Sequence, residues 1–381
     1  MPPLAARTVA PSDLSHEETA AWEAIAAAHP AFGNPLLGPA FAREVGAVRA
    51  DARVTVYRRG ERVVGFLAHH RRPGGLGRPL AAPLSDYHGL VGVADAGIEG
   101  PRALDLAGLS AYRFTGLVDP HGVFAGVGGD GAPAYAVRFD GSAEDYLEGL
   151  RAASPKRFKN WRRLDHRLGR EVGEIRLEAS RDPAVLHRLL DWKRAQFART
   201  GVTDFLREGW TRALLERLAD LDGPLRGLTV ALWAGDTLAA GHFGVARNGW
   251  YHPWIASTNP DLAEHSPGQI FLTRAIAAMP ALGLTTYDLG PSHDHYKRHY
   301  AAPLVMVGEG TAAASNPAGA LAGGRERLWV AAGARRPGMV GRLRRRMDAI
   351  ATLELTAAGR LRGFADAVAA LPRRHAGGEC D

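Results

Sequence analysis

Cysteine is almost absent from this chain of 381 residues, since Cys380 is its only one and lies next to the C-terminus. A single cysteine excludes an internal disulfide and argues against cysteine catalysis. Long hydrophobic runs are missing too, because no apolar stretch approaches the roughly 20 residues that a membrane-spanning helix needs. The start, Met1 to Arg7, lacks the apolar segment of a secretory signal. We therefore expect a cytoplasmic protein.

Acidic residues fail to balance the basic ones mainly in the last part of the chain, where arginine is frequent. The formal net charge is +7. From Leu321 onward there are 12 arginines and 6 acidic residues, which gives this segment +6 and leaves about +1 for the rest. The basic charge thus belongs to a tail and not to the globular body, so the sequence argues against a nucleic-acid-binding protein.

The length and the order of the predicted elements indicate two domains. A chain of 381 residues, of which 46% are hydrophobic, exceeds the usual size of one core. Hairpin signals occur around residues 59–61 and 234–236, and in each half helices precede the hairpin while a strand, a helix and a strand follow it. This pattern predicts a duplicated α/β unit. We place the first domain at residues 1–141, a connecting helical segment at 142–171, the second domain at 172–313 and a basic tail at 314–381.

The most informative stretch begins with a strand rich in aromatic residues, from Gly249 to Ser257. After a polar loop, Ser266 is a suitable helix N-cap and Pro267 suits the first helical position. Gly268 has no side chain, so a ligand could approach the free N–H groups of the first turn. These donors and the helix dipole attract phosphate. We therefore predict an anion site at Ser266, Pro267, Gly268 and Gln269.

A second short strand, from Thr285 to Leu289, carries Asp288 and is followed by Gly290 and by the pair Tyr296-Lys297. This order of strand, helix start, helix, strand and acid resembles the C-terminal half of a GNAT-type N-acyltransferase domain. The Ser-Pro-Gly helix start, the Tyr-Asp-x-Gly strand end and the Tyr-Lys pair resemble more specifically the CelD/BcsL-type acetyltransferases. Those are tandem-GNAT proteins associated with exopolysaccharide synthesis and related to Fem-type aminoacyltransferases. The resemblance stops before the tail.

The resemblance implies an α/β fold with two mixed-sheet, tandem GNAT-like domains. The pyrophosphate of acyl-CoA would lie on the helix that starts at Ser266, and its pantetheine arm would follow the strand at Trp254 and Ile255. The first half has no matching Ser-Pro-Gly start. We therefore expect acyl-CoA, with acetyl-CoA as the leading choice, to bind to the second half alone.

Catalytic candidates gather near the second strand. Fem-type relatives carry an aromatic-lysine pair at the matching place, which implies that Lys297 faces acceptor phosphate or the reacting carbonyl and that Tyr296 shapes the acceptor site. A lysine supplies a point charge to a phosphate or an oxyanion. Asp288 could accept a proton or orient the acceptor, or it could simply cap the following turn. His252 and His242 are possible bases because imidazole titrates near neutrality, or else ordinary core histidines.

The candidates for acceptor binding lie farther from this stretch. Asp86-Tyr87 resembles an Asp-Tyr pair of the CelD/BcsL-type sequences, whose first domain contributes acceptor contacts. Lys193 and Gln196 lie three positions apart near Trp192, so they share one helical face, and they also match that family's pattern. These four residues could bind a sugar or its phosphates, although an exposed helix face would explain Lys193 and Gln196 equally well.

Three histidines, His293, His295 and His299, suggest a metal site. Zinc sites normally need a full set of His, Cys or carboxylate ligands, and neither a cysteine nor a clear group of carboxylates completes this one. We therefore expect no metal.

The tail is rich in Ala, Gly and Arg, which predicts a mainly solvated or partly disordered segment. A basic amphipathic helix around Arg342 to Arg346 is the alternative. It would dock to anionic lipid or to a membrane glycosyltransferase, which would place the protein peripherally on the inner face of a membrane.

We predict an acetyl-CoA-dependent N-acyltransferase that acts on an amino sugar, free, nucleotide-linked or lipid-linked, in envelope or exopolysaccharide synthesis. The amine would attack the thioester directly, because no conspicuous Ser or Cys nucleophile motif is present. A Fem-like alternative would use aminoacyl-tRNA, contact RNA through the basic stretch from Arg151 to Arg170, and depend steeply on salt. A non-catalytic alternative is an accessory subunit of a polysaccharide synthase that is recruited through the tail.

Overall fold

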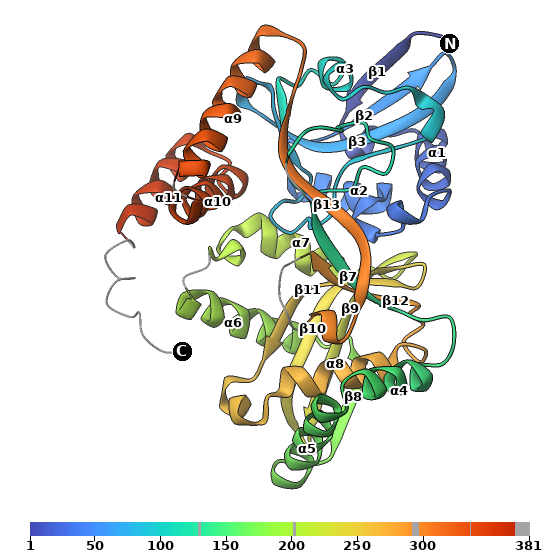
Figure 1. The fold of residues 1–381 in the computed structure, drawn as a ribbon, viewed down its shortest axis with the longest axis vertical. Helices are drawn as coiled ribbons and strands as arrows, with labels where there is room; N and C mark the ends of the chain where they lie inside the picture. Colours follow the sequence, from blue (N-terminus) through green and yellow to red (C-terminus); the bar gives the residue numbers. More distant parts are fainter. Residues whose placement is uncertain (129–130, 201–202, 292–296, 336, 370–381) are drawn as a thin grey trace.

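One long mixed sheet runs through the computed structural model, which describes residues 1–128, 131–200, 203–291, 297–335 and 337–369. The strand order is β1-β2-β3-β4-β6-β13-β7-β12-β11-β10-β9-β8, and β5 pairs with β3. The two halves of the chain occupy opposite ends of this sheet, with β13 between them (Figure 1). The strands are β1 (Leu4–Val9), β2 (Ala52–Arg59), β3 (Arg62–Arg72), β4 (Leu76–Pro79), β5 (Leu90–Gly92), β6 (Ala111–Leu117), β7 (Ala132–Arg138), β8 (Ile175–Ser180), β9 (Leu225–Ala234), β10 (Thr237–Arg247), β11 (Trp250–Thr258), β12 (Thr286–Pro291) and β13 (Ala302–Ala313).

Helices cover both faces of the sheet. Residues of α1, α2, α6 and α7 share one hydrophobic cluster with strands of both halves, so this cluster joins the halves. A second cluster lies under α5 and α8 on the C-terminal half, and a third packs α3 against the N-terminal half. The helices are α1 (His16–Ala27), α2 (Pro39–Val48), α3 (Gly100–Leu106), α4 (Ala143–Ala153), α5 (Pro155–Glu171), α6 (Pro183–Thr200), α7 (Gly209–Ala219), α8 (Pro267–Ala278), α9 (Pro317–Arg335), α10 (Pro337–Leu353) and α11 (Ala357–Ala369).

The element order of the two halves matches in three dimensions. Strands β1 to β4 lead to a parallel pair, β4 with β6, and strands β8 to β11 lead to a second parallel pair, β11 with β12. A parallel pair needs a crossover connection, which includes α3 in the first half and α8 in the second. The structure thus confirms the predicted mixed α/β fold with a repeated unit.

Two strands at the centre of the sheet tie the halves together. Strand β7 pairs antiparallel with β12, for example at Val137 and Tyr287. Strand β13 pairs with β7 through residues 302–307 and with β6 through residues 308–313. Because β7 belongs to the segment predicted as the first domain, that segment supplies main-chain hydrogen bonds to the sheet of the second half. The domain limits themselves stay a prediction.

Two strands form where the sequence gives no clear signal. Strand β1 lies at the start of the chain, and β4 lies in a segment rich in Gly and Pro. Pairing with β3 and β6 explains how so short a strand as β4 forms. Helix α1 is capped by Ser15. Ser15 Oγ accepts from the N–H of Glu18, and the Glu18 carboxylate accepts from the N–H of Ser15, which together form a capping box.

The tail forms three helices, α9 to α11, that lie beside the N-terminal half (Figure 1). Asp348 of α10 accepts hydrogen bonds from Arg78 at 2.8 Å and from Arg113 at 3.1 Å. The expectation of partial disorder is therefore wrong for these helices, although most of their described side chains are exposed or half-buried, as a solvated tail would have them. None of the helices described is long and apolar enough to cross a membrane.

Candidate active site

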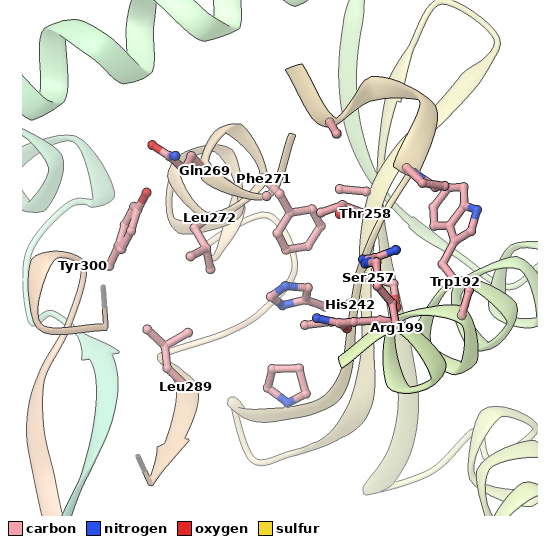
Figure 2. Close-up of a pocket in the computed structure, with 18 of the residues that line it drawn as sticks. Trp192, Arg199, His242, Ser257, Thr258, Gln269, Phe271, Leu272, Leu289 and Tyr300 are labelled. Atoms are coloured by element: carbon pink, nitrogen blue, oxygen red, sulfur yellow. The ribbon is translucent and has the colours of Figure 1, made fainter. Parts of the chain in front are cut away.

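Strands β11 and β12 part soon after they begin. They pair in parallel only at Trp250 with Thr286 and at Tyr251 with Tyr287. Beyond these two pairs a cavity of about 800 Å³ opens, lined by α6, β10, β11 and α8, by Leu289 of β12 and by Tyr300 (Figure 2). A gap between the two strands is therefore present, and it is wide enough for a small-molecule ligand.

One edge of this gap consists of backbone groups of β11 that no described strand pairs with. The Asn259 N–H donates to Ala239 O at 2.9 Å. Because hydrogen-bonded and non-hydrogen-bonded pairs alternate in an antiparallel ladder, Thr258 forms a non-hydrogen-bonded pair with β10. By alternation, the N–H and C=O groups of Ala256 and Thr258 point away from β10 and into the gap. Lys193 Nζ donates to Ala256 O at 3.2 Å. An extended ligand with amide groups could pair with this edge as an added strand does.

The start of α8 supplies a narrower anion site than the sequence predicted. Ser266 holds the N-cap position in a left-handed conformation with φ of 49°, and its side chain makes no cap hydrogen bond. The Ser266 N–H donates to Ala263 O and the Gln269 N–H donates to Ser266 O, both at 3.0 Å. Pro267 has no N–H. Gly268 is left as the first-turn donor that lines the cavity and has no backbone partner among the described residues.

Basic side chains border the same cavity. Arg157 of α5 and Arg199 of α6 are exposed and line it, together with Gln269 at the start of α8. Figure 2 shows Gln269 and Arg199 on different sides of the hollow. Two guanidinium groups and the positive end of α8 would therefore attract an anionic ligand to this cavity.

The inner wall of the cavity is apolar apart from His242. Its ring contacts Phe271 in a tilted arrangement with centroids 4.1 Å apart, and its Nδ1 lies 2.7 Å from the Tyr287 hydroxyl. Leu272 and Leu289 complete this part of the wall (Figure 2). Burial, and secondarily Lys193, lowers the pKa of His242 to about 3. His242 is therefore a neutral imidazole at physiological pH and suits a site for an uncharged group.

A buried carboxylate, Asp288, lies where the two strands begin to part. It accepts hydrogen bonds from Asn34 Nδ2 at 2.9 Å, from the Tyr87 hydroxyl at 2.7 Å, from Trp250 Nε1 at 3.2 Å and from the Gly290 N–H at 2.7 Å. Burial raises the pKa of Asp288, but the His252 imidazole and these donors outweigh burial and lower it below its usual value. Asp288 is therefore a fixed anion that both halves of the chain hold in place.

His252 links Asp288 to a second carboxylate. Its Nε2 lies 3.1 Å from Asp86 Oδ2, and its Nδ1 lies at an ion-pair distance of 3.4 Å from Asp288 Oδ2. Burial alone would lower the pKa of His252, but the two carboxylates outweigh it and raise the pKa to about 9. His252 is therefore an imidazolium at neutral pH. This differs from the predicted role of a base, since a protonated imidazole can only donate a proton.

Lys297 completes the group of charges around Gly290. The backbone of Gly290 has a φ of 75°, and a Cβ placed there would lie 3.6 Å from Asp86 Oδ2, 3.9 Å from Lys297 Nζ and 4.0 Å from His252 Cε1. Lys297 is buried, and its Nζ donates to Gly290 O at 3.4 Å. One carboxylate and two cations thus ring a small space beside Leu289, which lines the cavity.

The equivalent gap in the first half is filled by the chain itself. His88 Nε2 accepts hydrogen bonds from Thr115 N–H at 3.1 Å and from Gly116 N–H at 3.0 Å, so it caps the edge of β6 that faces the gap. A Cβ at Gly116 would lie 1.9 Å from Asp86 O, which shows how closely residues 80–89 pack there. The same segment carries Asp86 and Tyr87 to the charges of the second half. The first half therefore supplies side chains to the site instead of a second groove.

The structure brings together five of the predicted residues, namely Asp86, Tyr87, His252, Asp288 and Lys297. The predicted acceptor residue Gln196 instead lines the cavity near the anion site, and the side chain of Trp254 packs on the core cluster between the halves, as Ile255 does.

Some site residues lie outside the described residues or outside the prediction. Tyr296, His293 and His295 fall in the segment 292–296, which the structure does not describe. In the part of the chain that is described, no group of three or more His, Cys, Asp or Glu side chains could hold a metal ion. Sequence reasoning missed Asn34, which lies 254 positions from its partner Asp288 and carried no local signal.

A family model matches the part of the chain that contains most of this site. Residues 155–298, less than half of the chain, match the model of the acetyltransferase (GNAT) domain family. Domains of this family use acyl-CoA, so the protein is an acyltransferase. This match includes the cavity, β11, α8, β12 and Lys297. No curated protein matches the chain.

Solved structures share the fold at low sequence identity. FemX is 13% identical, with 83% of this chain and 99% of its own covered and a TM-score of 0.52. A tandem GNAT protein from the clavulanic acid biosynthesis pathway is 13% identical over 82% of this chain and 99% of its own, with a TM-score of 0.46. The C-terminal domain of a putative lysylphosphatidylglycerol synthetase from Agrobacterium fabrum is 12% identical over 82% and 95%, also with a TM-score of 0.46. The likeness to FemX shows the fold alone.

Proposed function

We propose that the protein transfers an acyl group, with acetyl-CoA as the leading donor, to the amine of an amino sugar. The observation that carries this proposal is that β11 and β12 move apart after two residue pairs and that charged residues lie where they part. A thioester that enters between β11 and β12 meets His252, Lys297 and Asp86 beyond the last strand pair.

The donor fits the cavity in an extended form. Its diphosphate binds at the Gly268 N–H between Arg157 and Arg199, and its pantetheine amides pair with the edge groups of Ala256 and Thr258. The acyl group then lies toward the strand pair at Tyr251, on the side of Leu289, which lines the cavity and follows Asp288 in β12. The three parts of the donor take this order because the free edge of β11 leads from the anion site to the point where β11 and β12 part.

The residues at this point suit direct attack by an amine. Asp86 is 41% exposed, so its carboxylate can reach an incoming acceptor and take the proton that the amine loses. As the C–N bond forms, the His252 imidazolium and the Lys297 ammonium stabilise the oxyanion. The C–S bond then breaks, and one of these cations returns a proton to the CoA thiolate. Asp288 stays ionised and keeps His252 charged and oriented.

The acceptor belongs to envelope or exopolysaccharide synthesis in this proposal, as in the CelD/BcsL-type proteins that the Ser-Pro-Gly, Tyr-Asp-x-Gly and Tyr-Lys motifs resemble. Support comes from Asp86 and Tyr87, which matched that pattern and which the fold places at the point of parting. A carboxylate beside the acceptor path favours a substrate with a basic amine over an alcohol.

Release of CoA measured against a panel of free, nucleotide-linked and lipid-linked amino sugars tests the proposal. We expect turnover with at least one amino sugar and its loss in Lys297→Ala, with acetyl-CoA binding retained. An unchanged rate in Lys297→Ala would remove this lysine from the mechanism. Saturable acetyl-CoA binding with no turnover of any amine would contradict the proposed acceptor class.

A second donor is favoured by one observation. Helix α5 carries exposed basic residues beside a surface hollow that Arg151, Lys159, Arg162 and Arg163 line, and Arg157 joins this face to the cavity. The phosphates of aminoacyl-tRNA could follow this face and deliver an ester to the same site. Titration with acetyl-CoA and with aminoacyl-tRNA separates the two donors, because RNA binding would weaken steeply as salt increases.

A further inference from the structure

Exposed hydrophobic side chains gather in the three C-terminal helices. Of the ten large hydrophobic residues that are exposed in the described part of the chain, eight lie between positions 321 and 364. Single exposed apolar residues are normal on a protein surface, but a concentration in one segment marks an interaction surface. The eight residues are Leu321, Leu328, Val330, Leu343, Met347, Leu355, Leu361 and Phe364.

Charges in the same helices are divided between an inner and an outer side. Glu326 accepts hydrogen bonds from Arg344 and Thr311, and Asp348 accepts from Arg78 and Arg113 of the body. These two carboxylates therefore lie on the inner side of the helices, where they accept hydrogen bonds. Other arginines remain outside, and the exposed ones are Arg327, Arg335, Arg345 and Arg362, whereas Arg325 lines a hollow beside Arg78 and Arg113 of the body. The outer side of α9 to α11, which we call the tail face, thus combines exposed apolar side chains with positive charge.

The tail face cannot turn inward, because the body holds α10 by its C-terminal end. Arg49 donates to Thr352 O at 3.4 Å, Trp210 Nε1 to Leu353 O at 3.3 Å and Arg72 to Glu354 O at 2.8 Å. Donors from the body, two of them cations, satisfy carbonyls that a helix end leaves free. Leu353 itself is buried. The exposed apolar groups of these helices are therefore a fixed surface.

The remaining parts of the molecule are poor candidates to cover this surface. Residues 370–381 contain one large hydrophobic residue, Leu371, and two arginines that Glu379 and Asp381 balance, so they offer little apolar area and no net charge. The other strongly basic surface of the body, on α5, would repel the tail face of a second copy. A partner that covers the tail face must therefore carry negative charge at its own surface and have an apolar layer below that surface.

We propose that the tail face docks on the surface of an anionic phospholipid bilayer. Apolar side chains of amphipathic helices insert at the boundary between headgroups and acyl chains, and arginines bind the phosphate of the headgroups. The binding needs no membrane-spanning helix. It does not depend on the proposed reaction, because the tail face lies on α9 to α11 and shares no residue with the cavity.

Co-sedimentation of the full chain with vesicles tests the proposal. We expect binding to vesicles that contain phosphatidylglycerol, much weaker binding to phosphatidylcholine alone, and a partial loss in high salt, because the apolar part of the binding is not screened. The triple variant Leu328→Gln, Leu361→Gln, Phe364→Ser alters side chains that are 71%, 72% and 49% exposed, so it should melt like the wild type. It should lose vesicle binding by about tenfold or more.

A matched control changes the other basic surface. Arg162→Gln with Arg163→Gln removes two positive charges from α5 and should leave vesicle binding unchanged. Wild-type binding in the triple variant, or loss of binding in the α5 variant, would overturn the proposal. So would a lack of binding to phosphatidylglycerol vesicles. A dimer that the triple variant converts to a monomer would assign the tail face to self-association instead.

Discussion

His252 Nε2 lies 3.1 Å from Asp86 Oδ2, although the two residues are 166 positions apart and belong to different halves of the chain. The other ring nitrogen faces Asp288, which is fully buried, whereas Asp86 is 41% exposed. One imidazolium thus joins a carboxylate that a substrate can reach to a carboxylate that it cannot reach. The packing of the two halves therefore assembles the site.

Asp86→Asn should reduce turnover while leaving the fold intact. The amide cannot take the proton of the amine, so we expect kcat to fall by about 100-fold with little change in the KM for acetyl-CoA. Because Asp86 also helps to keep the buried His252 charged, the melting temperature should fall modestly, and turnover is compared well below it. The measurement is CoA release under saturating acceptor. Asp95→Asn is a suitable control, because Asp95 forms an exposed ion pair with Arg62 far from the cavity, and equal losses in both variants would contradict this role of Asp86.

Stability should fall as the pH rises through the range set by His252. Its folded pKa of about 9 exceeds the ordinary value of 6.5. The unfolded chain therefore loses this proton first, and the stabilisation is complete below about pH 6.5 and lost as the pH approaches 9. The difference amounts to at most about 3 kcal/mol, because each pKa unit corresponds to about 1.4 kcal/mol.

Urea unfolding at a series of pH values from 6 to about 10 measures this dependence. In His252→Gln the decline between neutral and alkaline pH should largely disappear, while the variant is less stable than the wild type at pH 6. A wild-type free energy of unfolding that rises over this range, or an equal decline in both proteins, would show that His252 is not the group responsible.

Gly290→Ala should abolish activity by occupying the space between Asp86, Lys297 and His252. The added methyl group would lie within about 4 Å of all three. The left-handed backbone at Gly290 also destabilises the alanine variant by about 1 kcal/mol. Gly283→Ala is the matched control, since Gly283 has a similar φ of 68° but no heavy atom within 4 Å of its added Cβ. Both variants should lose similar stability, and only Gly290→Ala should lose turnover.

Lys193→Met tests the edge of β11 as the binding site of the donor. Lys193 Nζ donates a hydrogen bond to Ala256 O at the edge of the cavity, and burial lowers the pKa of this lysine. If the pantetheine arm takes the same carbonyl, removing the ammonium should lower the KM for acetyl-CoA several-fold and leave kcat unchanged. A raised KM for acetyl-CoA would instead place Lys193 on the phosphates of the donor, and a raised KM for the acceptor alone would support its predicted role in binding a sugar or its phosphates.

The sequence revealed the second half of the site because its signals are local. The aromatic strand, the Ser-Pro-Gly start and the short strand with Asp288 each form an element within about 15 residues, and the structure has β11, α8 and β12 at these places. Proline and glycine restrict the backbone directly, so such signals survive without tertiary context.

The contributions of distant residues could not be predicted in this way. Asn34 reaches Asp288 across 254 positions, and the charge of His252 depends on two carboxylates that the fold brings to it. The helices of the tail are ordered by partners such as Arg72, which lies 282 positions from Glu354. Such contacts depend on the packing of the halves, and no periodicity within either segment encodes them.

Calorimetric titration of acetyl-CoA into the wild type and into Gly268→Glu tests most directly whether the cavity between β11 and β12 holds the donor. The new carboxylate would lie at the start of α8, in the position of the diphosphate, and a Cβ there meets only Thr258, at 3.2 Å. We predict saturable binding of one acetyl-CoA per chain to the wild type and none to a folded Gly268→Glu. Equal binding to both proteins, or no binding to the wild type, would contradict the assignment of this cavity to acyl-CoA.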